Sequence, residues 1–222
     1  MLVEGRLSFL EVHAATAGSI AIAALCGATL AASSPAAAGS VGVLLLVMAT
    51  LALGYTVPPL KLSYRGLGEL DVALTHSIGV MLCGFVFQGA AWNEPLPWLL
   101  GAPLLLAVLP GIILAGIPDH DADRATGKGT LAVRIGIRRA YRLAAACAVL
   151  SAASALTLAH VEATAGLLAG IGWFVLPHAA WLVLQLLRRA EEPPRAARID
   201  GLMTVALAYT LWFAAIPLVN LL

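Results

Sequence analysis

The sequence predicts an all-α protein, a polytopic bundle of transmembrane helices. Of its 222 residues, 61% are hydrophobic and only 11% carry a charged side chain, and the mean hydropathy is +0.93. Soluble domains do not have such a composition. Seven apolar segments follow one another, each in the range of about 17–25 residues that a helix needs to cross a bilayer. Helices are expected because a segment in the hydrocarbon must satisfy its own backbone hydrogen bonds.

The predicted spans follow one another along the whole chain. They are Phe9–Ala32, Ser40–Val57, Leu70–Trp92, Trp98–Ile117, Ile135–Leu158, Thr164–Leu187 and Leu202–Leu222. The first lies close to Met1 but lacks the length profile and cleavage site of a signal peptide. The many Gly, Ala and Ser residues in these segments allow close helix contact. We therefore expect one domain, residues 1–222, embedded in the lipid bilayer.

The 13 Lys and Arg residues of the chain lie in alternate loops. The basic loops contain Arg6, Lys61, Arg65, Arg124, Lys128, Arg134, Arg138, Arg139, Arg142, Arg188, Arg189, Arg195 and Arg198. The opposite loops, near Ser33–Gly39, Asn93–Pro97 and His160–Ala163, contain none. By the positive-inside rule the basic loops face the cytoplasm. We expect an integral protein of a prokaryotic inner membrane, with its N-terminus and active face on the cytoplasmic side.

The first chemically informative loop covers residues 55–69, after the second span. Pro58 and Pro59 end that span, because the residue before a proline avoids helical geometry. Lys61 and Arg65 are four residues apart, so a helical turn would place them on one face. One interpretation is that both cations only obey the positive-inside rule. Their pairing with a second loop rich in acids and bases favours a functional role.

The second loop, residues 118–136, brings carboxylates and cations together. On a helix, Asp119 and Asp123 face the same way, whereas Asp121 points roughly opposite. Two carboxylates on one face repel each other unless a cation lies between them. Mg²⁺ prefers oxygen ligands and commonly joins one or two carboxylates to substrate phosphates. The pattern therefore indicates a Mg²⁺ site, the alternative being a solvated acidic loop balanced by local basic residues.

Basic residues of the second loop are candidates for binding the phosphate itself. Lys128 and Arg134 follow the carboxylates, and Arg124 is a further candidate. A guanidinium group suits bidentate contact with phosphate oxygens. We expect these cations to hold the phosphate charge that the metal leaves unbalanced.

Taken together, the two loops contain a pair of motifs that is specific in combination. The motifs read Tyr55-x-x-Pro58-Pro59-x-Lys61-x-x-x-Arg65-Gly66-x-Gly68-Glu69 and Asp119-x-x-x-Asp123-x-x-x-Gly127-Lys128-x-Thr130-Leu131-x-Val133-Arg134-x-Gly136. With this pair of motifs, the chain resembles the UbiA superfamily of intramembrane prenyltransferases. The likeness is closest to the branch that contains 1,4-dihydroxy-2-naphthoate polyprenyltransferases, and through the order of the spans it covers the whole chain.

The resemblance implies Mg²⁺-dependent transfer of a prenyl group from a polyprenyl diphosphate to an aromatic quinone precursor, within the membrane. Asp119 and Asp123 match the second of the family's two Asp-rich motifs and would be catalytic metal ligands. The apolar bundle would hold the prenyl tail and shield an allylic cation from water. No nucleic-acid partner is expected. The basic positions at which diphosphate contact is expected are Lys61, Arg65, Lys128 and Arg134.

The sequence departs from the family pattern at its N-terminal side. The family has nine spans and a first motif of the form Asn-x-x-x-Asp-x-x-x-Asp, whereas neither Asn93 nor Asn220 begins such a motif. Residues 2–8 look like the segment that normally follows it. We therefore expect a shortened UbiA-like domain that lacks the first two helices and has less than full activity. A non-catalytic membrane scaffold or a transporter-like protein is the alternative.

A CDP-alcohol phosphotransferase and a transporter are both less compatible with the sequence. A CDP-alcohol phosphotransferase needs Gly-x-x-x-Asp-x-x-x-Asp, but position 115 is Ala. A transporter is expected to have broken helices or polar residues near the midplane, for which only His76 and Gln88 are candidates.

Glu69 and Asp71 lie at the start of the third span, where acidic residues stabilise a helix N-terminus. Substrate contact is the alternative role for both.

Overall fold

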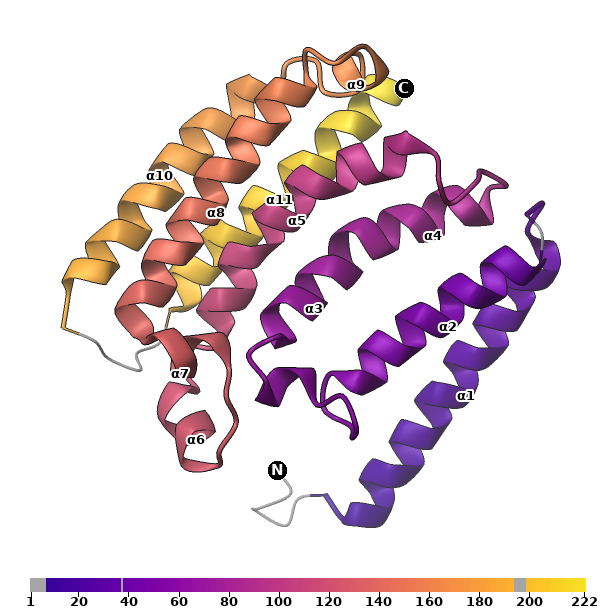
Figure 1. Ribbon diagram of the computed structural model, residues 1–222, viewed down its shortest axis with the longest axis horizontal. Coiled ribbons are helices and arrows are strands. Elements are labelled where there is room, and N and C mark those ends of the chain that lie inside the picture. Colours follow the sequence, from indigo (N-terminus) through magenta and orange to yellow (C-terminus); the bar gives the residue numbers. More distant parts are fainter. Residues whose placement is uncertain (1–6, 37, 194–198) are drawn as a thin grey trace. The chain divides into compact units, whose positions relative to one another are not determined.

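The computed structural model describes residues 7–36, 38–193 and 199–222, and within these ranges it contains helices and turns but no strand. The long helices are α1 (Phe9–Ser33), α2 (Ala38–Gly54), α5 (Pro95–Ala115), α8 (Ile137–Leu158), α10 (Ile171–Glu191) and α11 (Asp200–Leu221) (Figure 1). The third predicted span consists of α3 (Gly68–Leu74), the π-helical turn η2 (Thr75–Gly79) and α4 (Val80–Phe87). The connections contain the short helices η1 (Leu62–Tyr64), α6 (His120–Ala125), α7 (Leu131–Ile135) and α9 (Glu162–Ala165).

The helices confirm the predicted transmembrane architecture. In the described part of the chain, six helical segments are long and apolar enough to cross a membrane. They are Phe9–Ser33, Gly68–Phe87, Pro95–Ala115, Ile137–Leu158, Ile171–Glu191 and Asp200–Leu221. The remaining predicted span corresponds to α2, which is apolar but has only 17 residues. Three of the basic residues used to orient the chain, Arg6, Arg195 and Arg198, lie outside the described residues.

The sixth span begins later than the apolar pattern predicts. The expected start was Thr164, but α10 begins at Ile171. Gly170, just before it, has a φ of +73°, a conformation that glycine adopts without steric cost. Thr164 instead belongs to the separate short helix α9, and its hydroxyl donates a hydrogen bond to the carbonyl of Leu158. The apolar composition continues through this turn, so hydropathy alone does not mark the boundary.

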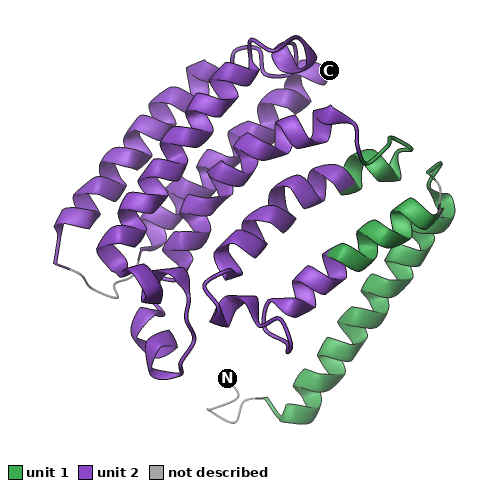
Figure 2. Cartoon of the chain, in the orientation of Figure 1, with its two compact units in different colours: residues 1–47, 83–92 green, residues 48–82, 93–222 purple. Residues whose placement is uncertain are grey.

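The chain divides into two compact units, coloured separately in Figure 2. Residues 1–47 and 83–92 form the smaller unit, and residues 48–82 and 93–222 form the larger one. In the smaller unit, α1 begins with a capping box in which Ser8 and Glu11 bind each other's backbone N–H groups. The Ser34 hydroxyl also donates to the carbonyl of Phe87, at 2.8 Å. The larger unit contains both loops that carry the predicted site.

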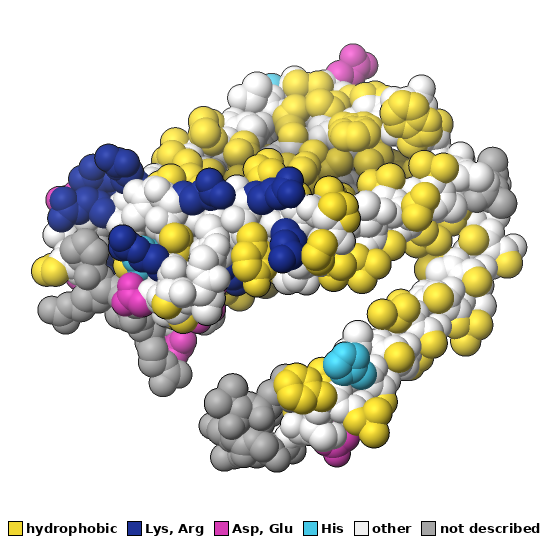
Figure 3. Space-filling view, turned by 60° about the horizontal axis from the view of Figure 1, so that its bottom comes forward, with side chains coloured by type: hydrophobic (Ala, Val, Ile, Leu, Met, Phe, Trp, Pro, Cys, Tyr) yellow, Lys and Arg dark blue, Asp and Glu magenta, His cyan; other side chains and the backbone are white. Residues whose placement is uncertain are grey.

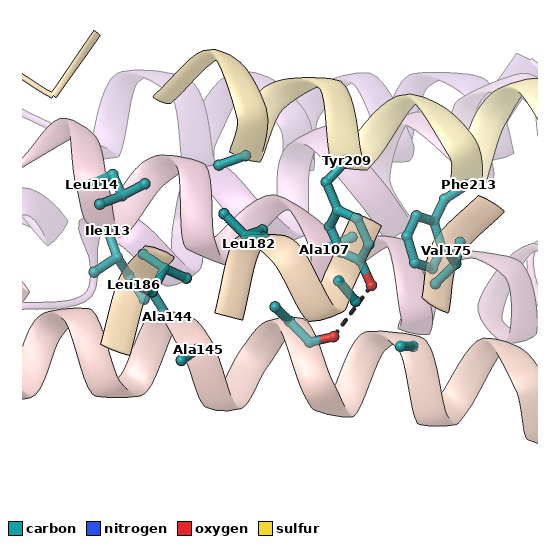
Figure 4. Packing of buried hydrophobic residues seen from close by; sticks show 14 of the residues in the cluster. Ala107, Ile113, Leu114, Ala144, Ala145, Val175, Leu182, Leu186, Tyr209 and Phe213 are labelled. Carbon is teal, nitrogen blue, oxygen red and sulfur yellow. Dashed lines mark hydrogen bonds between the residues drawn. The ribbon is translucent and has the colours of Figure 1, made fainter. Parts of the chain in front are cut away.

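The hydrophobic core of the larger unit lies among α5, α8, α10 and α11. Along α8, Ala140, Ala144 and Ala148 are fully buried. Their spacing of four residues places these small side chains on one face, which lets neighbouring helices approach closely. Larger side chains fill the space opposite them, including Leu182 of α10 and Ile113 of α5 (Figure 4).

One polar contact lies inside this core. The hydroxyl oxygens of Tyr209 in α11 and Ser151 in α8 are 2.8 Å apart (Figure 4), and the Tyr209 hydroxyl also donates to the carbonyl of Ala148. Both side chains are fully buried. Because a buried hydroxyl needs a partner, this pair fixes the register of α11 against α8. The bundle also carries the second loop, because α7 packs on α8 and α6 packs on α7 (Figure 1).

Candidate functional site

The first loop is closed by its own hydrogen bonds. The Tyr55 carbonyl accepts from both the backbone N–H of Ser63, at 3.0 Å, and the Ser63 hydroxyl, at 2.7 Å. Gly68 lies against the same two residues, and a Cβ there would come within 2.9 Å of the Ser63 Cα. The second glycine of the Gly66-x-Gly68 motif therefore allows the loop to return against the start of α3.

Lys61 and Arg65 do not share the helical face that their spacing suggested. Lys61 has a φ of +45° and precedes the three-residue 3-10 helix η1, so no α-helical turn connects the two residues. The Lys61 Nζ lies 5.3 Å from the centroid of the Tyr64 ring, a cation–π contact. Arg65 Nη2 donates to the carbonyl of Pro59 at 2.9 Å. Both cations are exposed and are held by their own loop.

Asp119 and Asp123 lie one helical turn apart, which confirms the local geometry that their spacing predicted. Asp119 is the N-cap residue of α6, and its carbonyl accepts from the N–H of Asp123 at 2.8 Å. Asp123 is only 8% exposed, whereas the Asp119 side chain is exposed. Asp121 points away: its side chain is 81% exposed and its carboxylate accepts from His120 Nδ1 at 2.8 Å.

Lys128 pairs with the buried carboxylate of the second loop. Its Nζ lies 3.2 Å from Asp123 Oδ1, and its backbone N–H donates to the Asp123 carbonyl at 2.8 Å. Burial by itself lowers the pKa of the Lys128 ammonium. The hydrogen bond and negative charge of Asp123, with smaller contributions from Tyr55 and Asp119, outweigh burial and raise that pKa above its ordinary value. Lys128 is therefore a cation at neutral pH.

Arg134 joins the two loops. Its Nε donates to the carbonyl of Gly129 at 2.8 Å, and its Nη2 donates to the carbonyl of Tyr64 at 3.4 Å. Gly66 makes room for this side chain: a Cβ there would lie 2.5 Å from Arg134 Cδ and Nε. Gly66 also has a φ of +74°, so glycine is favoured for two separate reasons. The two loops predicted to lie on the same side of the bundle are thus in contact.

Glu69 provides a second contact between the loops. It lies in the first turn of α3, as expected for an acid at a helix N-terminus. Its Oε1, however, accepts the N–H of Leu131, the first residue of α7, at 2.8 Å. A carboxylate in this position satisfies an N–H group that has no acceptor within its own helix. Glu69 therefore caps a helix of the second loop, a role that no local pattern in the sequence indicates.

Two buried polar atoms at this junction have no hydrogen-bond partner among the described residues, namely Oε2 of Glu69 and Oγ1 of Thr130. Their residues are 7% and 6% exposed. A third such atom is Oδ1 of Asp71, in the same helix as Glu69. Unpaired buried oxygens are costly, and their presence beside the start of α7 distinguishes this junction from the apolar core.

The carboxylates of the second loop suit a hard cation that also binds phosphate. Asp119 and Asp123 offer oxygen donors one turn apart, and Asp119 makes no side-chain hydrogen bond or ion pair with any described residue. Over the described ranges, no three His, Cys, Asp or Glu side chains are grouped so that they could hold a metal ion alone. Mg²⁺ commonly takes one or two carboxylates and completes its shell with substrate phosphates and water. The residues present fit that mode of binding.

The structure brings only part of the predicted site into direct contact. Asp123 contacts Lys128, and Arg134 contacts both loops. Within the described residues, no hydrogen bond or ion pair connects Lys61 or Arg65 with the carboxylates of the second loop. These two cations lie in the loop that Arg134 holds against the second one.

Comparisons with known proteins agree with the motifs. Residues 1–208 match the UbiA prenyltransferase family. The chain is also similar to UbiA prenyltransferase domain-containing protein 1 of Dictyostelium discoideum, with 29% identity over 91 residues. That match covers 41% of this chain and only 27% of the length of the Dictyostelium protein. No solved structure matches the chain. The chain, an integral membrane protein with several apolar helices, belongs to the UbiA prenyltransferase family.

Proposed function

We propose that this protein binds a polyprenyl diphosphate with Mg²⁺ and transfers the prenyl group to an aromatic quinone precursor, as in the 1,4-dihydroxy-2-naphthoate branch of the family. The observation that carries the proposal is the position of Asp119 and Asp123. They lie one helical turn apart beside Lys128, next to membrane-spanning helices of a chain that belongs to the UbiA family. The family supports a metal-dependent prenyltransferase in general terms.

Asp119 and Asp123 are the proposed metal ligands. When bound, Mg²⁺ would neutralise diphosphate charge and assist the departure of that group. Asp123 is oriented by the ion pair with Lys128, whereas the exposed Asp119 carboxylate is accessible from the loop surface. The two residues therefore combine one fixed and one accessible oxygen donor.

Lys128 is proposed to contact the diphosphate while it holds Asp123. An ammonium group has three N–H donors, and the ion pair with Asp123 uses one of them. Negative charge builds on the leaving oxygen as the prenyl carbon–oxygen bond breaks, and a fixed cation stabilises that state most. The electron pair of the bond leaves with the diphosphate. The acceptor carbon then forms its new bond to the prenyl carbon and releases its proton to water.

The remaining basic residues are proposed to bind the diphosphate at the rim of the site. Arg134 has five N–H donors, of which the carbonyls of Gly129 and Tyr64 occupy two. Lys61 and Arg65 are exposed on the loop that Arg134 holds. We place this face on the cytoplasmic side of a prokaryotic inner membrane, because all these cations lie in the basic set of loops.

Binding and transfer should be measured separately on the full chain in lipid nanodiscs. The probes are radiolabelled geranylgeranyl diphosphate, with Mg²⁺ or with EDTA, and 1,4-dihydroxy-2-naphthoate as the acceptor. We expect Asp123→Asn to weaken Mg²⁺-dependent binding by about 100-fold or more, since even residues that only orient a metal ligand contribute 10–100-fold. Asp121→Asn is the matched control, because it removes the same charge from the exposed face of α6.

The outcomes separate the parts of the proposal. Diphosphate binding that is unaffected by EDTA, or equally weakened by the two Asn substitutions, would contradict the assigned metal ligands. Mg²⁺-dependent binding without any transfer would retain the site but refute catalysis, and would favour the non-catalytic scaffold.

A further inference from the structure

A cavity separate from the Asp123–Lys128 ion pair lies beside α6. This cavity of about 360 Å³ is lined by His120 and Arg124 of α6, Ile135 at the end of α7, and Ile137, Arg138 and Arg139 in the first turn of α8. At about 30 Å³ for each water molecule, it has room for roughly a dozen waters and so for more than a single phosphate ion. Asp123 is not among its lining residues, because its side chain is directed to Lys128.

The charges around this cavity are unbalanced. Three of its lining side chains are arginines, which are always protonated, and no carboxylate lines it. Within the described residues, Arg124, Arg138 and Arg139 have no side-chain hydrogen bond or ion pair. By contrast, Arg142, one turn further along α8, forms an ion pair with Glu191 at 2.9 Å. The like charges at the cavity would be stabilised by an anion.

The backbone adds positive potential at the same place. Gly136, with a φ of +84°, separates α7 from the 22-residue helix α8 and serves as its N-cap without a side-chain hydrogen bond. The first N–H groups of a helix lack internal acceptors, and acids are preferred near them. The first turn of α8 contains no acid but two arginines, Arg138 and Arg139. This arrangement is unfavourable unless a negative group binds there.

The position of the cavity identifies the kind of anion. Its residues lie in the first turn of Ile137–Leu158, one of the segments long and apolar enough to cross the membrane. The end of such a segment lies at the depth of lipid headgroups. The lining combines arginines with Ile135 and Ile137, which suits a phosphate attached to an apolar body. Figure 3, which brings this end of the molecule forward, shows Lys and Arg side chains beside yellow hydrophobic ones.

We propose that this cavity binds the phosphate headgroup of an anionic membrane phospholipid. Basic pockets at the ends of transmembrane helices recognise such headgroups by charge and shape. Two negative charges lie nearby, and neither lines the cavity. Asp121 accepts from His120 and is 81% exposed. Glu191 feels the charge of Arg138 but forms its ion pair with Arg142. None of its residues is a proposed metal ligand. Arg124, a candidate for phosphate contact in the sequence, lines this cavity and makes no contact with Asp123 or Lys128 in the described structure.

The test is a titration of the full chain, purified in neutral detergent, with short-chain phosphatidylglycerol. Short-chain phosphatidylcholine and inorganic phosphate are titrated in parallel, and binding is measured by calorimetry. We expect phosphatidylglycerol to bind more tightly than either of the other two. The double variant Arg138→Gln/Arg139→Gln should weaken its binding by about tenfold or more. Arg188→Gln/Arg189→Gln removes the same charge from the end of α10 and should leave it unchanged.

Other results would overturn the assignment. Equal affinity for phosphatidylglycerol and phosphatidylcholine would exclude recognition of an anion. Inorganic phosphate binding as tightly as the lipid would identify a free-phosphate site instead. Equal losses in the two double variants would show attraction by overall charge alone. If Arg138→Gln/Arg139→Gln does not fold, Arg124→Gln provides a second test, because Arg124 lies in a different helix. Arg124→Gln should also weaken the binding of phosphatidylglycerol, and an unchanged affinity would refute the proposal.

Discussion

The hydrogen bond from Leu131 to Glu69 predicts a specific response to substitution. Glu69→Ala removes the acceptor of the first N–H group of α7, 62 residues further along the chain. Glu69→Gln keeps an oxygen in the same position, so it should preserve most of the bond. Glu162→Ala is the control, because Glu162 is an exposed acid in the first turn of another short helix, α9.

The magnitude follows from two opposing contributions. Loss of a helix cap costs about 0.5–2 kcal/mol, and a hydrogen bond to a charged group contributes about 1.5–3 kcal/mol. The net loss of stability is smaller than these values, because the substitution also removes Oε2 of Glu69, which is buried without a partner. We therefore expect Glu69→Ala to ease local opening of α7 by about 1–2 kcal/mol. Glu69→Gln should have an effect below about 1 kcal/mol.

Hydrogen–deuterium exchange in detergent micelles measures this directly. At 1.4 kcal/mol for each tenfold change, amide exchange at Leu131 should become about 5–30 times faster in Glu69→Ala. Exchange within α8 should be unchanged, because Glu69 makes no hydrogen bond to that helix. The reasoning would be refuted if the amide of Leu131 exchanged in Glu69→Ala at the same rate as in wild type. It would also be refuted if Glu69→Gln accelerated that exchange as much as Glu69→Ala, because charge or packing would then matter rather than the cap.

Three other outcomes follow from the loops and the core. Gly66→Ala should lower the unfolding midpoint more than Gly127→Ala. Both positions have positive φ, at a cost of about 1–2 kcal/mol, but of the two only a Cβ at Gly66 meets Arg134, which joins the loops. Equal unfolding midpoints for the two variants would contradict this. The pKa of Lys128 is raised in the folded state above its ordinary value of 10.5, so its ion pair stabilises fully below that pH and loses this effect as pH rises through the folded pKa. The difference in unfolding free energy between wild type and Lys128→Met should therefore be constant from pH 7 to 9 and shrink above 10.5. If the difference already decreases near pH 7, the ion pair of Lys128 is not its source. Tyr209→Phe should cost about 0.6–1.7 kcal/mol in mixed-micelle unfolding, the range for hydrogen bonds between membrane helices, and an unchanged free energy would show that its serine partner contributes nothing.

Features set by local spacing were predictable from the sequence. The apolar segments gave the helices because a bilayer fixes both their composition and their length. The relation of Asp119 to Asp123 followed from a spacing of four residues, and α6 forms the expected turn. The placement of the two loops on one side of the bundle followed from their both belonging to the basic set, with two predicted spans between them. Their contact through Arg134 and Glu69 was not predicted.

Other features depended on geometry that the spacing does not encode. Lys61 adopts a left-handed conformation, so the expected common face with Arg65 does not form. The hydrogen bond of Glu69 joins residues that only tertiary packing brings together. The start of α10 was misplaced because Gly170 turns the backbone within a stretch that remains apolar. In each case the deciding contact is a backbone conformation or a distant partner.

The contact between Arg134 and Tyr64 also has a consequence for how the protein is made. The two residues are 70 positions apart, and two membrane-spanning segments, Gly68–Phe87 and Pro95–Ala115, lie between them. The guanidinium can reach the Tyr64 carbonyl only after the first of these has crossed the bilayer and the second has returned. Formation of this contact therefore requires both segments to be inserted, and it marks the stage of biosynthesis at which the helical hairpin is complete and the two loops meet.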